Sequence, residues 1–231
     1  MKVLIIQNHQ AENLGTFEAY LQARNINHFV HNAFTNKVFP DLADYDAVLV
    51  GGTPISIYAP TKPSWLNVEI ARLADALKTN KPYLGICGGG QILASILGAE
   101  VKRNPVKEVG SYEVTLTNLG QTSPFFKGFP TEIPVFQFHG DTFDVPHCAE
   151  LLVEGKECKN QAFGKGKALA VQFHLEVSSK TAGLWADEYK QWLGGFGKSK
   201  AQIVEECQSI EKQTRILSET LMDNFLRVAK S

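Results

Sequence analysis

A single cysteine lies in segment 81–94, KPYLGICGGGQILA, at a place where a thiol could act as a nucleophile. The apolar run 82–86 predicts a strand that ends directly before Cys87, and the apolar run after the glycines predicts a helix. Such a strand-to-helix turn exposes a nucleophile at the edge of a sheet, and the N-terminus of the helix favours a thiolate. Taken alone, the turn fits an inert, buried cysteine equally well.

His174 and Glu176, in the stretch ALAVQFHLEV, are candidates for the base that a thiol nucleophile needs and for the carboxylate that orients this base. Residues two apart on a strand point to the same side, so the imidazole and the carboxylate can meet. The alternative is that FHLE is only the polar end of a strand. Together with Cys87, the pair favours catalysis.

A developing negative charge on a substrate oxygen requires backbone N–H donors, and two segments supply candidates. One donor is the amide of Gly88, next after the cysteine, and a second could come from segment 50–56, VGGTPIS, which follows the apolar run 46–50. The alternative for GGTP is an ordinary tight turn. A phosphate loop fits GGGQ poorly, because the GxGxxG spacing and the P-loop lysine are both missing.

Alternating strands and helices are expected to position these residues. Apolar runs at 3–7, 28–31, 46–50 and 82–86 predict strands, and amphipathic stretches at 13–24 and 64–78 predict helices between them. This alternation predicts an α/β fold with an open, mostly parallel sheet that is covered by helices on both faces. Ligands bind at the carboxyl ends of such strands, which is where the candidate residues lie.

The rest of the chain changes character twice. Segment 100–175 contains strand-like runs separated by short turns and predicts an antiparallel extension of the sheet. Helical patterns return at 181–193 and in a long tail with apolar residues three and four positions apart. We expect one domain at 1–195 and a helical tail at 196–231 that packs on the same domain; a partner-binding helix or dimer seam is the alternative.

Composition excludes several classes of protein. The 231 residues include 23 Lys+Arg and 24 Asp+Glu, without a basic cluster, so nucleic acid is not an expected partner. The N-terminal apolar run is too short for a signal peptide or a membrane span. The cysteines form no CxxC pair, so neither a metal site nor a disulfide framework is expected, and a cytoplasmic location fits. The four cysteines are Cys87, Cys148, Cys158 and Cys207.

Several motifs together resemble the class I, triad-type glutamine amidotransferases. The motifs are C-x-G-x-Q at 87–91, GGTPIS, the downstream FHLE, an early QNHQAENLG and the segment HGDTF at 139–143. Stand-alone proteins similar to the glutaminase domain of GMP synthase are the most similar in appearance. The resemblance covers most of the first 195 residues.

The resemblance implies a flavodoxin-like fold and hydrolysis of the side-chain amide of glutamine. In this scheme Cys87 forms a γ-glutamyl thioester, His174 transfers protons and Glu176 orients the ring. Gln91 and the backbone at Gly52 and Thr53 would line the glutamine site.

By the same resemblance, His139 and Asp141 would lie at the entrance, where a structural role in the turn is an equal alternative. No cofactor is implied. A separate synthetase is the implied receiver of the ammonia, and the oligomeric state stays open.

Two departures from the family pattern lead to alternative functions. The family usually shows Gly-Gly-Pro, whereas segment 52–54 reads Gly-Thr-Pro and places the β-branched Thr53 next to the proline. A β-branched residue there is costly if the backbone needs positive φ, which suggests a weakly catalytic regulatory protein with a redox-sensitive Cys87. Gly88 and Gly90 replace bulkier residues, which predicts a looser turn and a wider pocket. A wider pocket favours a γ-glutamyl peptide or conjugate as substrate with the same triad.

Overall fold

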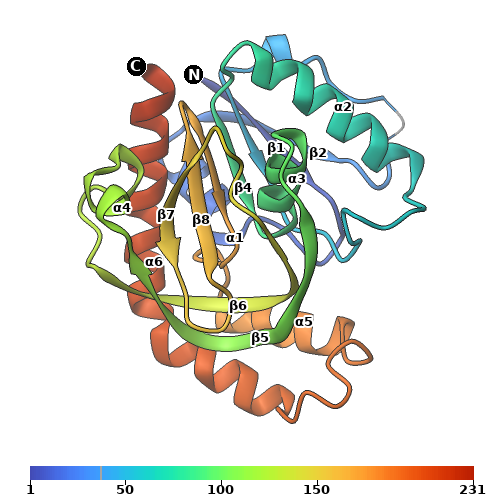
Figure 1. Ribbon diagram of the computed structural model, residues 1–231, viewed down its shortest axis with the longest axis vertical. Coiled ribbons are helices and arrows are strands. Elements are labelled where there is room, and N and C mark those ends of the chain that lie inside the picture. Colours follow the sequence, from blue (N-terminus) through green and yellow to red (C-terminus); the bar gives the residue numbers. More distant parts are fainter. Residues whose placement is uncertain (37) are drawn as a thin grey trace.

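The computed structural model describes residues 1–36 and 38–231 of the chain. These residues form a nine-stranded sheet in the order β2-β1-β3-β4-β9-β8-β7-β5-β6, with helices packed around it (Figure 1). The strands are β1 (Lys2–Gln7), β2 (Asn27–Asn32), β3 (Ala47–Val50), β4 (Tyr83–Ile86), β5 (Val101–Leu116), β6 (Glu132–Phe143), β7 (Glu150–Glu154), β8 (Asn160–Lys165) and β9 (Ala168–Val171). The helices are α1 (Gly15–Ala23), α2 (Ser64–Lys78), α3 (Gly88–Ile96), α4 (Asn118–Thr122), α5 (Ser179–Glu188) and α6 (Lys200–Lys230), with short 3₁₀ turns at Leu42–Asp44 and Pro124–Phe126.

The first half of the sheet is parallel, from β2 through β1, β3 and β4 to β9. Alternate residues of a strand face opposite sides, so β1, β3, β4 and β9 each contribute to two apolar cores. Strands that are buried on both faces read as continuous apolar runs, which is why VLII and AVLV predicted them. One core is completed by α1 and α6, and the other by α2 and α3. The expected flavodoxin-like α/β fold is confirmed.

The second half of the sheet is antiparallel and contains β8, β7, β5 and β6. The long β5 and β6 form a curved ribbon across the lower part of the view in Figure 1. One part of segment 100–175 differs from the expectation of an antiparallel extension. Strand β9 pairs with β4 in parallel and with β8 in antiparallel orientation, so it joins the two halves and carries its C-terminal end to the parallel edge.

The C-terminal helices differ in length from their apolar patterns. Helix α5 ends at Glu188, and the residues after it form turns, although the sequence pattern extends to 193. Helix α6 begins at a complete capping box, in which Ser199 and Gln202 exchange hydrogen bonds with each other's backbone. The helix packs against α1, α5, β5 and β6, and buries Leu221, Met222 and Phe225 completely.

Candidate active site

Cys87 lies in a strained turn between β4 and α3. Its backbone has φ 50° and ψ −107°, a region that L residues rarely adopt and that costs about 1–3 kcal/mol. The amide of Cys87 donates to the carbonyl of Val171, the last residue of β9, over 2.8 Å. A Cβ at Gly89 would lie 2.2 Å from the carbonyl oxygen of Val50, so only glycine permits this approach of α3 to β3. The strand, the strained residue and the helix therefore follow one another as the sequence predicts.

Gly88 and Gly90 do not loosen this turn, and that expectation is wrong. A Cβ on Gly88 would lie 2.7 Å from both the backbone nitrogen and Cγ2 of Thr53, and one on Gly90 would lie 2.9 Å from the carbonyl oxygen of Val171. Both glycines are buried, so the space that a side chain would need is already filled. A side chain at position 88 would collide with Thr53.

Thr53 adopts no strained conformation. Outside glycine, positive φ angles occur among the described residues only at Asn25, Asn80 and Cys87. The hydroxyl of Thr53 instead accepts a hydrogen bond from the amide of Ile55 over 3.2 Å. Thr53 therefore has no positive φ, which is the condition under which a β-branched residue would distort this segment.

His174 and Glu176 lie beyond the end of β9, not on it as the sequence suggested. His174 exchanges two backbone hydrogen bonds with Phe136 of β6, of 2.8 and 3.1 Å. This bridge holds the backbone from which the imidazole ring projects. Nδ1 of His174 contacts Oε1 of Glu176 at 2.6 Å, and Oε2 accepts from the amide of Leu175 at 3.0 Å. The ring also packs edge-on against Trp185, with centroids 4.9 Å apart. Base and carboxylate are thus locked together in a buried position.

The protonation of His174 follows from its neighbours. Burial opposes the charged ring, but the Glu176 carboxylate and the nearby Cys87 sulfur outweigh burial and raise the pKa of His174 to about 10. The other ring nitrogen, Nε2, is buried and has no hydrogen-bond partner in the part of the chain that the structure describes. Since Nδ1 is held by Glu176, Nε2 is the atom available for proton exchange with sulfur or substrate.

Two glutamines connect the cysteine to the opposite side of the site. Nε2 of Gln172 lies 3.5 Å from Sγ of Cys87, and Oε1 of Gln172 accepts from Nε2 of Gln91 at 3.2 Å. Gln91 also reaches the carbonyl of Asp141 over 3.4 Å. Gln172 was missed from the sequence, because a glutamine two residues before a histidine carries no chemical signal of its own.

The candidate oxyanion donors face one another. A Cβ built on Gly88 would lie 2.7 Å from the nitrogen of Thr53, so the loop after β3 lies close to the first turn of α3. Within the described residues, the amides of Gly52, Thr53 and Gly88 donate to no backbone or side-chain acceptor. Unpaired amides beside a nucleophile can bind a developing oxyanion.

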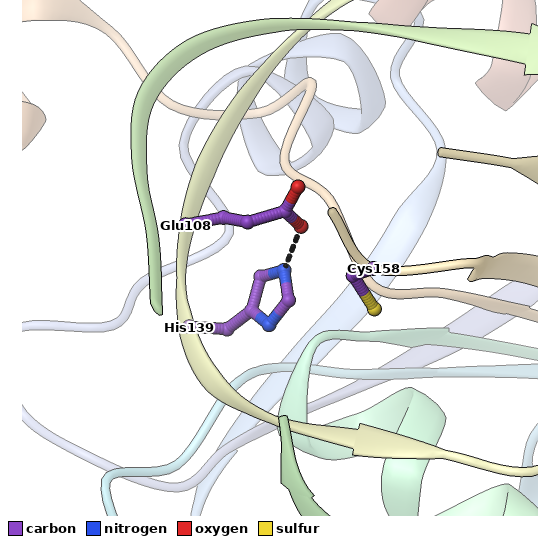
Figure 2. A group of neighbouring side chains, drawn as sticks. All are labelled: Glu108, His139 and Cys158. Carbon is purple, nitrogen blue, oxygen red and sulfur yellow. Dashed lines mark hydrogen bonds and ion pairs between the residues drawn. The ribbon is translucent and has the colours of Figure 1, made fainter. Parts of the chain in front are cut away.

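His139 and Asp141 are held by other parts of the protein. Nε2 of His139 contacts Oε2 of Glu108 at 2.8 Å (Figure 2). Nδ1 of His139 contacts the carbonyl of Asp141 at 2.9 Å. The carboxylate of Asp141 accepts from the hydroxyls of Ser56 at 2.6 Å and Tyr58 at 3.2 Å. Both residues line a cavity that Cys87 and His174 also line, but all their side-chain polar atoms already have protein partners. These contacts favour the structural alternative for the pair.

Glu108, His139 and Cys158 form the one group of potential metal ligands among the described residues, with ligand atoms within 4.8 Å of one another. Figure 2 shows the His139 ring directed at the Glu108 carboxylate, which also accepts from Gln161 at 2.9 Å. Burial raises the pKa of the Cys158 thiol to about 11, and its sulfur lies 3.1 Å from the hydroxyl of Thr142. A protonated thiol is a poor metal ligand, so the arrangement suits a hydrogen-bond network better than a metal.

A cavity of about 290 Å³ opens over the triad. Cys87 and His174 line this cavity, together with the loop after β3 and segment 138–141 of β6. Aromatic residues also line it: Phe138, Trp185, Tyr189 and Trp192. A concave cavity in which aromatic side chains meet convergent polar groups is typical of ligand sites.

A second carboxylate, that of Glu12, lies beside the triad and was not predicted as a site residue. Its Oε2 lies 2.1 Å from the position of a Cβ on Gly52, and its Oε1 accepts from the hydroxyl of Tyr189 at 2.7 Å. Burial raises the pKa of Glu12. The same hydroxyl lies 2.9 Å from Nδ1 of His9. Sequence spacing cannot show this contact, because Tyr189 follows Glu12 by 177 residues.

The geometry, a cysteine elbow with a buried His–Glu pair at the carboxyl edge of a parallel sheet, agrees with the comparison to known families. The family described as Glutamine amidotransferase class-I matches residues 6–186. The chain belongs to this family. The resemblance that the motifs suggested is confirmed.

Individual relatives of this amidotransferase are of two kinds. The glutamine amidotransferase-like protein YfeJ of Salmonella typhimurium is 26% identical over 95% of this chain and 97% of YfeJ. A GMP synthase subunit of Sulfurisphaera tokodaii is 31% identical over 62% of this chain and 73% of that subunit. The chain matches only 25% of the length of the GMP synthase of Caldanaerobacter subterraneus, at 34% identity over 58% of this chain.

Among solved structures, a glutamine amidotransferase from Thermotoga maritima resembles this chain along its whole length. It has a TM-score of 0.89 and 32% identity, and the match covers 100% of this chain and 99% of the other. The fold of this amidotransferase is therefore that of its family. Within the described residues, no helix is both long enough and apolar enough to cross a membrane.

Proposed function

We propose that this amidotransferase hydrolyses the side-chain amide of glutamine to glutamate and ammonia through Cys87, His174 and Glu176. The observation that carries the proposal is the buried 2.6 Å contact between Nδ1 of His174 and Glu176 at a cavity that His174 and Cys87 both line. A base oriented in this way, beside a cysteine in a strained elbow, has the parts required for acyl transfer.

The reaction follows from the atoms around the cavity. Nε2 of His174 takes the thiol proton of Cys87 as the sulfur attacks the amide carbon. A C–S bond forms, and the carbonyl oxygen becomes an oxyanion that the amides of Gly88 and Thr53 can bind. The C–N bond then breaks as Nε2 of His174 gives its proton to the leaving nitrogen, which departs as ammonia. Water gives a proton to His174 and attacks the thioester, the C–S bond breaks, and glutamate leaves.

Free glutamine is the substrate that the cavity supports best. The wider pocket that would favour a γ-glutamyl peptide or conjugate rested on Gly88 and Gly90, and both lie against other atoms of the protein. The weakly catalytic alternative rested on strain at Thr53, which has no positive φ. The structure therefore gives no support to the wider pocket or to strain at Thr53, on which these two alternative functions were based.

The ammonia is proposed to pass to a separate synthetase. This proposal is supported by the similarity to GMP synthase, which occurs both as a long chain and in separate subunits. Within the described residues, the chain forms the one sheet and its helices. A complex that channels ammonia predicts higher glutaminase activity when the synthetase is bound, which a titration of candidate synthetases against glutamate release measures.

The nucleophile is tested by replacing Cys87 with alanine. We expect glutamate and ammonia release from glutamine to fall to background, and labelling by a glutamine-like chloroketone to disappear, because the thioester cannot form. The matched control is Cys148→Ala, since Cys148 is exposed and should leave both readouts unchanged. Labelling of wild type at a residue other than Cys87, or unchanged hydrolysis in Cys87→Ala, would contradict the proposal.

A further inference from the structure

A glutamate that the proposed reaction does not use is completely buried behind the site. Glu69 belongs to α2 and is 0% exposed, in the apolar core between α2 and the sheet. Oε1 of Glu69 accepts from Nδ2 of Asn8 at 3.2 Å, and Asn8 directly follows β1. An isolated ionised carboxylate in a protein core costs much free energy, so the protonation of Glu69 depends on which of its two oxygens have hydrogen-bond partners.

Two atoms of this pair are left without partners. Oε2 of Glu69 and Oδ1 of Asn8 are both buried and accept no hydrogen bond from any described residue. Both are acceptors if Glu69 is ionised, and neither finds a donor. A proton on Oε2 would turn this atom into a donor, which could pair with Oδ1 while Nδ2 donates to Oε1. Protonation of Glu69 would in this way satisfy both orphaned atoms at once.

The orientation of the Asn8 amide is set by a backbone carbonyl. Nδ2 of Asn8 also donates to the carbonyl oxygen of Gly51 at 3.4 Å, and a flipped amide would place two acceptors against each other there. Gly51 is the first residue after β3 and leads directly into Gly52 and Thr53. The pair of Glu69 and Asn8 therefore holds the base of the loop that carries the candidate oxyanion donors.

No charged side chain compensates Glu69 among the residues that the structure describes. The nearby titratable group is Tyr83 on β4, whose pKa the Glu69 charge helps to raise and whose buried hydroxyl donates to the carbonyl of Gly89 at 2.7 Å. Burial keeps the pKa of Tyr83 well above its usual value, so this neighbour stays neutral. Burial likewise raises the pKa of Glu69 to about 8, and the bond from Asn8 opposes this only in part.

We propose that Glu69 in its protonated form is a positioning residue for the loop 51–53, which it holds through Asn8 and the carbonyl of Gly51. Loss of its proton breaks the bond to Oδ1 of Asn8 and places a charge in the core, so the pair separates and the loop loses the bond from Asn8 to the carbonyl of Gly51. The amide of Gly51 still donates to the carbonyl of Ile6 at 2.9 Å, so the loop shifts without detaching from β1. The effect on catalysis rests on the proposed glutaminase function. The protonation and the coupling to the loop do not.

The test that needs no activity is an NMR titration of the wild-type protein with labelled glutamate side chains and backbone amides. We expect the Glu69 carboxyl to stay protonated through neutral pH, and the amide shifts of Gly52 and Thr53 to titrate with the same midpoint. In Glu69→Gln this step in the amide shifts should vanish. Ionisation of Glu69 at its ordinary pH, or a loop that does not follow its titration, would overturn the proposal.

The kinetic test compares two replacements of Glu69. Glutamine offers the same donor and acceptor as the protonated acid, so Glu69→Gln should keep wild-type kcat near neutral pH and resist the loss of activity above pH 8. Glu69→Met removes both hydrogen-bonding groups and should lower kcat about 10- to 100-fold at all pH values, because the oxyanion donors lose their register.

The matched control is Asp75→Asn on the exposed side of the same helix. Equal losses in Glu69→Gln and Glu69→Met would contradict the positioning role. If wild type releases no glutamate at all, the proposed function fails, and the NMR titration still decides the role of Glu69.

Discussion

At the scale of single residues, the chemistry of the site depends on contacts that side chains far apart in the sequence make. Cys87 and His174 are separated by 87 residues in the chain, yet both line the same cavity. The pair of His174 and Glu176 was accessible from the sequence because both members lie in one short stretch. The roles of three other residues could not be predicted from the sequence, because they depend on contacts with distant parts of the chain. These residues are Glu12, Gln172 and Tyr189.

Glu176→Gln tests the orienting carboxylate. The Glu176 carboxylate opposes the effect of burial on the His174 ring, so its loss should lower the pKa of His174 and leave the ring in the wrong tautomer. We expect kcat for glutamine hydrolysis to fall about 10²- to 10⁴-fold, with a shifted pH profile. Glu205→Gln, at an exposed position of α6, is the control. A variant with wild-type kcat and pH profile would show that Glu176 is not required.

At the scale of elements, the site depends on how closely α3 approaches the loop after β3. Gly88, Gly89 and Gly90 bring the first turn of α3 against the ends of β3 and β9. The sequence indicated the strand, the turn and the helix correctly, because each has a local pattern. It misjudged the space around Gly88 and Gly90, because the atoms that fill it belong to Thr53 and Val171, which lie elsewhere in the chain.

Gly88→Ala should disturb both folding and catalysis. The added Cβ would meet the nitrogen and Cγ2 of Thr53 at 2.7 Å, and such overpacking costs about 1–3 kcal/mol of unfolding free energy. We expect a lower urea midpoint together with slower chloroketone labelling of Cys87. In the control Gly183→Ala, the Cβ meets only Val204 Cγ2 at 3.3 Å and Lys200 Cε at 3.6 Å, which flexible side chains accommodate. An unchanged urea midpoint in Gly88→Ala would mean that Thr53 can move aside.

At the scale of the whole molecule, the stability should depend on pH through groups buried near the site. Glu69 and His174 both have a folded-state pKa above the ordinary value, Glu69 moving from 4.5 to about 8 and His174 from 6.5 to about 10. A group whose pKa is raised on folding binds its proton more tightly in the folded protein. Its contribution to stability is complete below the ordinary pKa and is lost as the pH rises through the folded one.

The melting temperature should therefore fall as the pH rises from the acidic side to the alkaline side. We expect Glu69→Gln to remove the part of this decrease that lies between pH 4.5 and about 8, because the amide does not titrate. The part attributed to His174, between 6.5 and about 10, should remain. Thermal unfolding followed by circular dichroism across this range measures both. A Glu69→Gln curve parallel to that of wild type would contradict the assignment.

The sequence by itself determined the α/β class, the elbow at Cys87 and the candidate pair of His174 and Glu176. Hydrophobic periodicity and residue type are local properties, so they can be read along the chain. Only the tertiary structure decided that Gly88 and Thr53 fill one space, that His139 and Asp141 are held by protein partners, and that Glu12 and Glu69 lie beside and behind the site. Packing and desolvation depend on which distant segments meet, and no spacing within one segment encodes that.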